Sequence, residues 1–241
     1  MTTIADRFNA SAGSYSESAR IQPIVAKRLA EKLPLSPKRI LELGCGTGGL
    51  SLHLLNKFPN SDLTLSDISP SMLAVCRENI GEKPAYKKID AENLPRDIGK
   101  FDLVVSSLAF QWVEDLPSTL QNIVDILNPG GTLAFSLLGH QNFCEWADLL
   151  KQHGAASGLH EYPSAENFLW PAPFKGHVEQ EFLQEHHVNG RAFLKSLKKI
   201  GASTARVGHR PIPPSVMKEV LRSSDAGLTV SYHVLYGSLT I

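Results

Sequence analysis

The sequence predicts an α/β protein built on a doubly wound, mostly parallel β-sheet. Short apolar segments alternate with helical patterns over the first 150 residues. The apolar segments read as nearly continuous hydrophobic runs, which is typical of parallel strands buried on both faces. The first run enters a glycine cluster, Gly44–Gly49, where a strand turns into a helix. This alternation indicates right-handed βαβ units and a seven-stranded sheet with helices on both faces.

The first elements follow from helical spacing and from prolines. Glu17–Leu33 carries apolar residues at helical spacing and is followed by prolines, so we expect a helix. Arg39–Leu43 is a short apolar run and predicts the first strand. Gly48–Phe58 is expected to be the next helix, ended by Pro59, and Leu63–Ser66 the second strand.

The middle elements have clearer boundaries. Pro70–Ile80 is predicted as a helix, because a serine precedes it as N-cap and proline occupies its first position. Pro84–Ile89 and the valine-rich segment Phe101–Ser106 predict the third and fourth strands. Pro117–Leu127 is expected to be a helix stopped by an Asn-Pro-Gly-Gly sequence, and Thr132–Leu137 the fifth strand.

The regular alternation ends after the predicted helix Asn142–His153. Ala155–Gly176 contains three prolines and is expected to be a loop. It resembles nothing that would indicate its role. Four further elements are predicted to complete the sheet and its cover: strand His177–His187, helix Arg191–Ile200, helix Pro214–Arg222 and strand Thr229–Gly237.

Length and composition fit one globular domain spanning residues 1–241. Hydrophobic residues make up 42% of the chain and charged residues 20%, which is ordinary for a soluble protein. The 24 basic and 24 acidic residues cancel. The chain therefore lacks the basic excess that phosphate-backbone binding favours, and we expect no nucleic-acid partner.

Cysteine usage and hydropathy bear on the compartment. Cys45, Cys76 and Cys144 are far apart and odd in number, without a Cys-x-x-Cys pair, so neither a disulfide framework nor a thiolate metal site is expected. The N-terminus has no apolar signal core, and the longest apolar stretch, Phe101–Val113, is shorter than the roughly 20 residues of a membrane helix. We expect a cytoplasmic monomer that binds no metal and no membrane.

The glycine cluster is the strongest functional signal. Gly44, Gly46 and Gly49 satisfy the G-x-G-x-x-G pattern of dinucleotide-dependent dehydrogenases, but a lone match is weak. Glu42, on the strand before the glycines, is awkward beside a pyrophosphate and suits a cationic ligand with an amino group. Asp67 ends the second strand, where a carboxylate can accept both ribose hydroxyls, as in NAD enzymes.

The end of the third predicted strand helps to distinguish a dinucleotide ligand from a cationic nucleoside. Asp90-Ala91-Glu92 places acceptors where an adenine amino group would need them. No Tyr-x-x-x-Lys pair occurs in the chain, so the chemistry of short-chain reductases has no obvious base. The residues favour a cationic nucleoside over a dinucleotide.

Leu41–Gly48, Asp67 and Asp90 resemble the motifs of class I S-adenosylmethionine-dependent methyltransferases. The resemblance implies a glycine loop at the methionine end, an aspartate on the ribose, and Asp90 with Ala91 at the adenine. The cofactor-binding set implied in this way is Tyr15, Glu42, Gly44, Cys45, Gly46, Gly48, Asp67, Ile68, Met72, Asp90, Ala91 and Ser106.

Four further blocks resemble the malonyl-[acyl-carrier protein] O-methyltransferases of biotin biosynthesis: Arg7–Tyr15, Ser107–Trp112, Phe193–Ala202 and Leu228–Gly237. This resemblance implies methyl transfer from S-adenosylmethionine to the free carboxyl of a malonyl thioester, carried by acyl-carrier protein or coenzyme A. A carboxylate is ionised near neutral pH, since its ordinary pKa is about 4. No catalytic acid or base is therefore expected, and catalysis reduces to alignment and desolvation.

The segments outside the cofactor-binding core, residues 39–153, also carry an expectation. Segments 1–33 and 189–227 are expected to close over it as a helical lid, with Tyr15 over the cofactor. Basic residues share one face of the helix that begins near Arg191, where an acidic carrier could dock, and Lys198 is expected to turn toward the malonyl carboxylate. The expected substrate-binding set is Tyr15, Phe110, Gln111, Trp112, His140, Arg191, Lys195 and Lys198.

Two other functions remain open from the sequence. The Ala-Phe-Gln-Trp segment that ends at Trp112 also resembles trans-aconitate methyltransferases. The substrate could then be another small carboxylate, or a quinone precursor. A non-catalytic nucleotide-binding module is the alternative of a different class, and labelled-methyl transfer would distinguish it.

Overall fold

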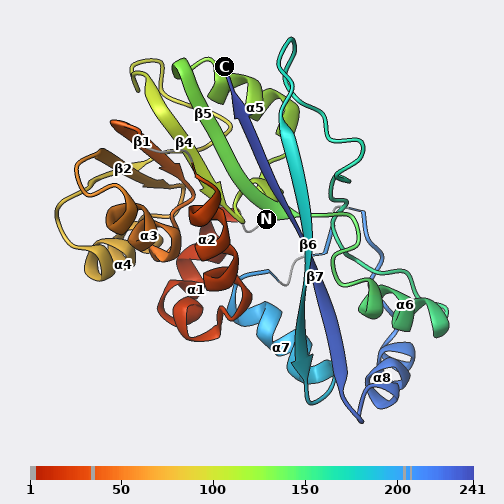
Figure 1. Cartoon of the computed structure of the whole chain (residues 1–241). Helices are drawn as coiled ribbons and strands as arrows, with labels where there is room; N and C mark the ends of the chain where they lie inside the picture. The colour runs from red at the N-terminus through yellow and green to blue at the C-terminus, as the bar shows by residue number, and fades with distance from the viewer. Residues whose placement is uncertain (1–3, 34–35, 203–204, 207) are drawn as a thin grey trace.

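One twisted sheet organises the chain (Figure 1). The computed structural model describes residues 4–33, 36–202, 205–206 and 208–241. The strand order is β3-β2-β1-β4-β5-β7-β6, with β1 to β5 parallel and β7 antiparallel to both of its neighbours. This arrangement confirms the predicted fold class. The strands are β1 Arg39–Leu43, β2 Asp62–Asp67, β3 Ala85–Lys88, β4 Phe101–Ser107, β5 Leu127–Leu138, β6 His177–His187 and β7 Leu228–Thr240.

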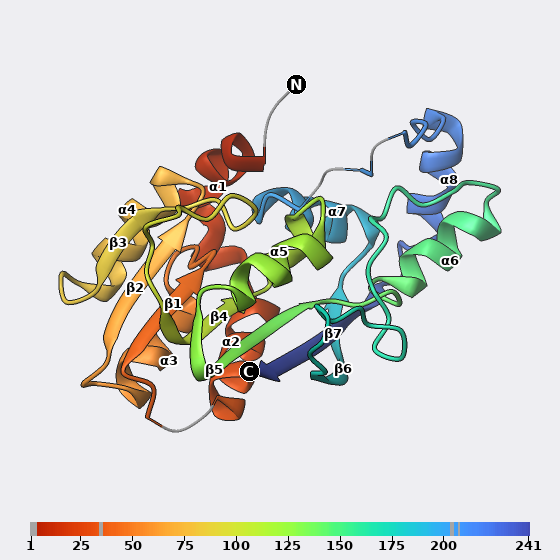
Figure 2. The ribbon, with the colours of Figure 1, turned by 90° about the horizontal axis from the view of Figure 1, so that it is seen from above.

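Helices cover both faces of this sheet (Figure 2). No helix in the described part of the chain combines the length and the apolar character that crossing a membrane requires. The helices are α1 Ile4–Ser18, α2 Ile21–Lys32, α3 Gly49–Lys57, α4 Pro70–Ile80, the short 3₁₀ helix η1 Phe110–Trp112, α5 Leu116–Val124, α6 Cys144–Gln152, α7 Gly190–Lys199 and α8 Pro214–Ser223.

Alternation along the strands divides the core into two clusters. On β1, Ile40 packs into the cluster that contains residues of α2 and α3. Leu41 and Leu43 point the other way and pack with residues of α5. Glu42 shares the face of Ile40, because successive side chains of a strand point to opposite sides. A carboxylate is thus fixed beneath α3 by the pleat of β1.

Two predicted boundaries are wrong. The helix expected to end at Leu127 ends at Val124, and Leu127 already pairs with Phe101 as the first residue of β5. The Asn-Pro-Gly-Gly sequence lies within β5, where the pairing register shifts and Gly130 takes a positive φ of 76°. The helix therefore ends before this sequence, which instead forms a bulge inside a longer strand.

The N-terminal helix expected over Glu17–Leu33 is also divided differently. It begins at Ile21, and α1 is a separate helix that apolar spacing did not indicate. Asn9 holds α1 in place: its Oδ1 accepts hydrogen bonds from the hydroxyl of Ser69, 2.6 Å away, and from the N–H of Ser71, 3.2 Å away. Ser69 also caps α4. Polar capping groups of α4 therefore help to anchor α1.

The long strands β6 and β7 extend beyond the parallel sheet toward α7 and α8 (Figure 1). Aromatic rings fix this extension. Phe193 of α7 is fully buried and packs edge-on against Phe143, with ring centroids 5.1 Å apart, and beside Trp146 at 5.5 Å. Tyr232 of β7 packs on Phe143 at 4.6 Å. α7 is therefore held rigidly against the sheet, and its basic residues face outward.

Asn9→Ala should release α1 without unfolding the domain. Two hydrogen bonds are lost, and each is worth about 0.5–1.5 kcal/mol net. The combined loss of about 1–3 kcal/mol should make opening of residues 4–18 about 5- to 150-fold more frequent. Native-state hydrogen exchange resolved by peptide would measure it. Asn167→Ala, at an exposed loop position, is the control. Unchanged exchange in α1 would contradict the anchoring role of Asn9.

Candidate active site

The glycine turn after β1 is shaped by backbone conformations that favour glycine. Gly44 has φ 71°, and a Cβ there would lie 2.4 Å from Cβ of Ala109. Gly46 has φ 54° and no heavy atom within 4 Å of the place of a Cβ, so its backbone borders open space. Gly48 has φ 97° and forms the N-cap of α3, where a Cβ would meet Ile80 at 2.8 Å. Gly44 and Gly48 permit close packing, while Gly46 leaves room for a ligand.

Asp67 ties this turn to the end of β2. Its Oδ2 accepts a hydrogen bond from the N–H of Gly46 at 2.9 Å, and its Oδ1 accepts one from the N–H of Ser69 at 2.8 Å. Burial raises the pKa of Asp67, and the backbone N–H donors oppose that shift. Since each carboxylate oxygen can accept more than one hydrogen bond, capacity remains for hydroxyl groups of a ligand.

A first pocket, the glycine-loop pocket, has a volume of about 310 Å³ and is lined by the glycine turn and Glu42. Glu42 is 1% exposed and accepts a hydrogen bond from the Ser51 hydroxyl at 2.6 Å. Burial raises its pKa to about 8. Glu42 is thus a mostly neutral acid at pH 7, which a cationic ligand would ionise.

A second pocket, the acidic pocket, continues from the first along the strand ends. It has a volume of about 120 Å³, and Gly44, Gly46 and Ser107 line both pockets. Its walls present carboxylates of Asp67 and Asp90, together with apolar side chains. The predicted cofactor residues that line it are Gly44, Gly46, Asp67, Ile68, Met72, Asp90 and Ala91.

The two pockets together fit S-adenosylmethionine. Glu42 lies where an ammonium group could bind, Asp67 where a ribose diol could bind, and the apolar walls by Ile68 and Met72 would sandwich a flat base. Asp90 is already engaged through Oδ1 by the N–H of Glu92, at 3.0 Å. Its carboxylate therefore orders the loop that borders the base.

Three predicted cofactor residues stand apart from this arrangement. Ser106 is fully buried, and its hydroxyl donates to the carbonyl of Leu43 at 2.8 Å, so its neighbour Ser107 reaches the pockets instead. Cys45 lines the glycine-loop pocket. Its thiol pKa is raised by a hydrogen bond to Cys76 and by burial, which indicates a packing role. Tyr15 belongs to α1, but its side chain lies outside the described residues.

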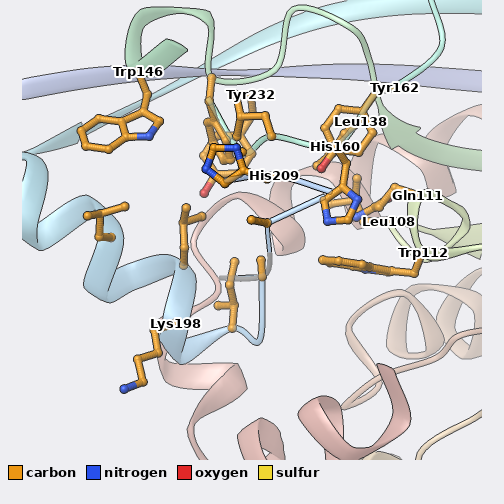
Figure 3. Close-up of a pocket in the computed structure, with 18 of the residues that line it drawn as sticks. Leu108, Gln111, Trp112, Leu138, Trp146, His160, Tyr162, Lys198, His209 and Tyr232 are labelled. Carbon is orange, nitrogen blue, oxygen red and sulfur yellow. The ribbon is translucent and has the colours of Figure 1, made fainter. Parts of the chain in front are cut away.

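A third pocket, the aromatic cavity, shares lining residues with the acidic pocket and is drawn in Figure 3. It has a volume of about 350 Å³. Phe8, Leu108 and Trp112 line both, so this group separates the two spaces. Leu108 follows β4 with a positive φ of 51°, which is strained for a leucine. This bend turns the chain into η1 and places Gln111 and Trp112 on the wall of the cavity.

Polar groups occupy two ends of this apolar space. Gln111, His160 and Tyr162 lie together beside Trp112 (Figure 3). Lys198 lines the opposite end, is exposed, and directs its ammonium away from that group, unlike the inward orientation expected from the sequence. None of the described lining residues is an aspartate or glutamate. The cavity therefore suits an anionic or neutral ligand better than a cation.

The remaining predicted substrate residues are spread more widely. Phe110 is buried, lines the acidic pocket and packs on Phe135. His140 lies outside the aromatic cavity, stacked edge-on against His233 at 5.3 Å. Arg191 and Lys195 lie on the outer face of α7.

The sequence did not indicate His160, Tyr162 or His209. They reach the cavity from the loop at 155–176 and from the segment that precedes α8. Neither segment has periodicity or a motif that could have indicated them.

Comparisons with known proteins identify the family of this chain. A family model described as a methyltransferase domain matches residues 40–131. Malonyl-[acyl-carrier protein] O-methyltransferase of Magnetococcus marinus is 38% identical over 239 residues, which cover 94% of this chain and 88% of that protein. The biotin biosynthesis bifunctional protein BioCD of Bordetella avium is 38% identical over 241 residues, which cover 98% of this chain and 51% of that protein.

A solved structure shares the fold. It is the N-methyltransferase NodS of Bradyrhizobium japonicum in complex with S-adenosyl-L-homocysteine, with a TM-score of 0.51 and 15% identity over 92% of this chain and 86% of that one. The similarity at this level concerns the fold, whereas the relative from Magnetococcus marinus establishes the family. The chain belongs to the malonyl-[acyl-carrier protein] O-methyltransferases, a family of class I S-adenosylmethionine-dependent methyltransferases.

Proposed function

We propose that this chain methylates the free carboxyl group of malonyl-[acyl-carrier protein], an early step of biotin biosynthesis. The observation that carries the proposal is the aromatic cavity: it contains hydrogen-bond donors but no acidic side chain among its described lining, and it meets the cofactor pockets at Phe8, Leu108 and Trp112. The names of the relatives from Magnetococcus marinus and Bordetella avium support the same substrate and pathway.

The chain's own residues would hold the cofactor from three sides. Glu42 would pair with its ammonium group, Asp67 would accept the ribose hydroxyls, and Asp90 with Ala91 would border the adenine. When bound, S-adenosylmethionine supplies an electrophilic methyl group. Gly46 would keep its backbone close to the ligand, because no side chain fills that space.

No residue needs to remove a proton from the acceptor. A malonyl carboxylate is ionised at pH 7, since its ordinary pKa is about 4. The chain's contribution is to align this group and to exclude water, because water around a carboxylate weakens it as a nucleophile. Phe8 and Trp112, whose ring centroids are 5.6 Å apart, would exclude water at the junction of the cavity with the acidic pocket.

Segments 1–33 and 189–227 would act as a lid over the core at 39–153. α1 lies against α4 and α7, and Phe8 of α1 contributes to the junction described above. α7 contributes Leu194, Leu197 and Lys198 to the cavity wall. The two segments thus enclose the same space from different sides.

The outer face of α7 would receive the acidic carrier protein. Phe193, Leu197 and Ile200 are buried, whereas Arg191, Lys195 and the two lysines 198 and 199 are exposed. A basic face beside the mouth of the substrate cavity would guide an acidic partner by long-range attraction. The expected reducing compartment and the expected monomeric state both stay predictions.

Mass spectrometry of the product tests this proposal. The protein should convert malonyl-[acyl-carrier protein] to its monomethyl ester with S-adenosylmethionine as donor. Trans-aconitate and quinone precursors, the substrates of the alternative functions, should remain unmethylated in the same assay. Methylation of either alternative in preference to the malonyl thioester would overturn the proposal, and transfer to none would favour a non-catalytic nucleotide-binding role.

Asp67→Ala should weaken S-adenosylhomocysteine binding at least tenfold while the fold survives. Hydrogen bonds to a charged group are each worth about 1.5–3 kcal/mol, and about 1.4 kcal/mol corresponds to a factor of ten. Titration calorimetry measures the affinity. Asp62→Ala, at the exposed start of the same strand, is the matched control. Unchanged affinity in Asp67→Ala would remove Asp67 from the ribose site.

Cofactor binding at pH 7 should release about one proton from Glu42. The pKa of Glu42 is about 8 in the free protein, so the group is mostly protonated, and an ammonium group beside it lowers that pKa. Affinity should therefore rise from pH 6 to about pH 8. Calorimetry in two buffers of different ionisation enthalpy counts the protons.

Glu42→Gln should abolish that release and weaken binding, whereas Glu78→Gln, exposed on α4, should change neither. Proton release that persists in Glu42→Gln would show that another group titrates.

Arg191→Glu or Lys195→Glu should raise the apparent KM for malonyl-[acyl-carrier protein] roughly tenfold at low salt, the lower end of the range for electrostatic steering. The effect should fade as salt shortens the Debye length below ~10 Å. Malonyl-CoA lacks the carrier's surface and should be less affected. Equal losses on both substrates, independent of salt, would contradict a carrier-docking role for this face.

A further inference from the structure

The inner end of the aromatic cavity carries polar side chains from two separate segments of the chain. Gln111 comes from η1, while His160 and Tyr162 come from the loop at 155–176. They converge beside Trp112 (Figure 3). The ring of His160 packs edge-on against Trp112 at 5.8 Å, and Tyr162 lies 6.3 Å from His160 between ring centroids. Segments far apart in the sequence thus build one polar end of the cavity.

Gln111 is the unusual member of this group. Its Oε1 is buried and has no hydrogen-bond partner among the described residues. A buried amide without partners costs about 1–3 kcal/mol, which native proteins rarely tolerate without a reason. Rotation of the terminal amide exchanges its oxygen for its NH₂ group, so Gln111 can present two donors to an acceptor in the cavity.

Tyr162 offers a donor at the same end. Burial raises its pKa to about 12, so the phenol stays neutral at pH 7 and keeps its proton. Its hydroxyl forms no hydrogen bond with any residue that the structure describes. The Tyr162 hydroxyl is therefore a hydrogen-bond donor for a ligand. A ligand that has hydrogen-bond acceptors and no donors would fit it.

The position of Gln111 sets it near the cofactor pockets. It lies between Phe110, which lines the acidic pocket, and Trp112, which lines both spaces. Lys198, the cation that the sequence suggested for the acceptor, lies at the other end. A group bound by Gln111 would therefore lie at the junction where the cavity meets the acidic pocket.

We propose that Gln111 and Tyr162 bind the carboxylate of the thioester substrate and so select malonyl over acetyl thioesters; this rests on the function proposed above. Ionised carboxylates accept hydrogen bonds and donate none, which matches the two side chains. Neutral donors compensate the loss of water around the charge. They do so without the ion pair that would draw electron density from the attacking oxygen, as a lysine would.

Calorimetric binding of malonyl-CoA and acetyl-CoA to the protein saturated with S-adenosylhomocysteine tests this inference. The two thioesters differ by the carboxylate alone. Wild-type protein should bind malonyl-CoA more tightly. Gln111→Ala and Tyr162→Phe should each weaken malonyl-CoA binding about tenfold, as expected for a hydrogen bond to a charged group, and should change acetyl-CoA binding less than about twofold. Gln111→Glu, which keeps the size and adds a negative charge, should reject malonyl-CoA more strongly.

Matched controls lie far from the cavity. Gln121→Ala on α5 removes a glutamine that bonds only Asp125, and Tyr86→Phe on β3 removes a phenol that burial also shifts to a pKa of about 12. Both should keep the wild-type preference. Equal weakening of the two thioesters by the Gln111 and Tyr162 variants, or an unchanged preference, would overturn the inference.

Failure of the proposed function gives a different result. If the wild-type protein methylates no malonyl thioester, the function itself is wrong. If it methylates malonyl-CoA while the Gln111 and Tyr162 variants keep the full preference over acetyl-CoA, only the assignment of these two residues is wrong.

Discussion

The hydrogen bond from the Gly46 N–H to the Asp67 carboxylate is the constraint on which the site depends. β1 and β2 are parallel neighbours, so their carboxyl ends meet at one edge of the sheet. Asp67, at the end of β2, accepts the hydrogen bond from the glycine turn that follows β1 and so fixes the position of that turn. The glycine-loop pocket and the acidic pocket exist on the two sides of this contact, and both share Gly46 as a wall. A ligand that spans them is positioned by the pairing of two strands before any flexible segment contributes.

The cofactor side could be predicted because its residues are local to the strand ends. Glu42, Asp67 and Asp90 each occupy a fixed position relative to a short apolar run, and parallel strands bring such positions together. The alternation of strands and helices predicted the sheet for the same reason. The boundary errors arose where tertiary pairing overrides local signals, as in the bulge that places Gly130 inside β5.

The substrate side could be predicted only in part. Gln111 and Trp112 follow directly from β4 and were recognisable in a motif, whereas His160, Tyr162 and His209 come from loops without periodicity. α1 is held by polar contacts through Asn9 and by the packing of Phe8 and Ala12, which form only when the chain folds. The orientation of Lys198 depends on how α7 is fixed by the aromatic contacts of Phe193, which no local pattern reports.

Neutral hydrogen-bond donors and positive charges occupy different places around the opening of the aromatic cavity. Inside, the described lining of the aromatic cavity offers donors without acidic groups, and outside, α7 offers exposed cations. Such a division lets a charged partner be attracted at a distance while its carboxylate meets neutral donors in a dry space. No general base is needed at the junction between cavity and cofactor, because the carboxylate is already ionised at pH 7.

A crystal structure of the protein with S-adenosylhomocysteine and malonyl-CoA tests the central claim most directly. The account predicts ribose hydroxyls within hydrogen-bond distance of Asp67, with the contact between Gly46 and Asp67 retained, and a thioether sulfur that faces the aromatic cavity past Leu108. The malonyl carboxylate should lie at that junction. A nucleoside bound away from Asp67, or a malonyl group outside the aromatic cavity, would contradict the account.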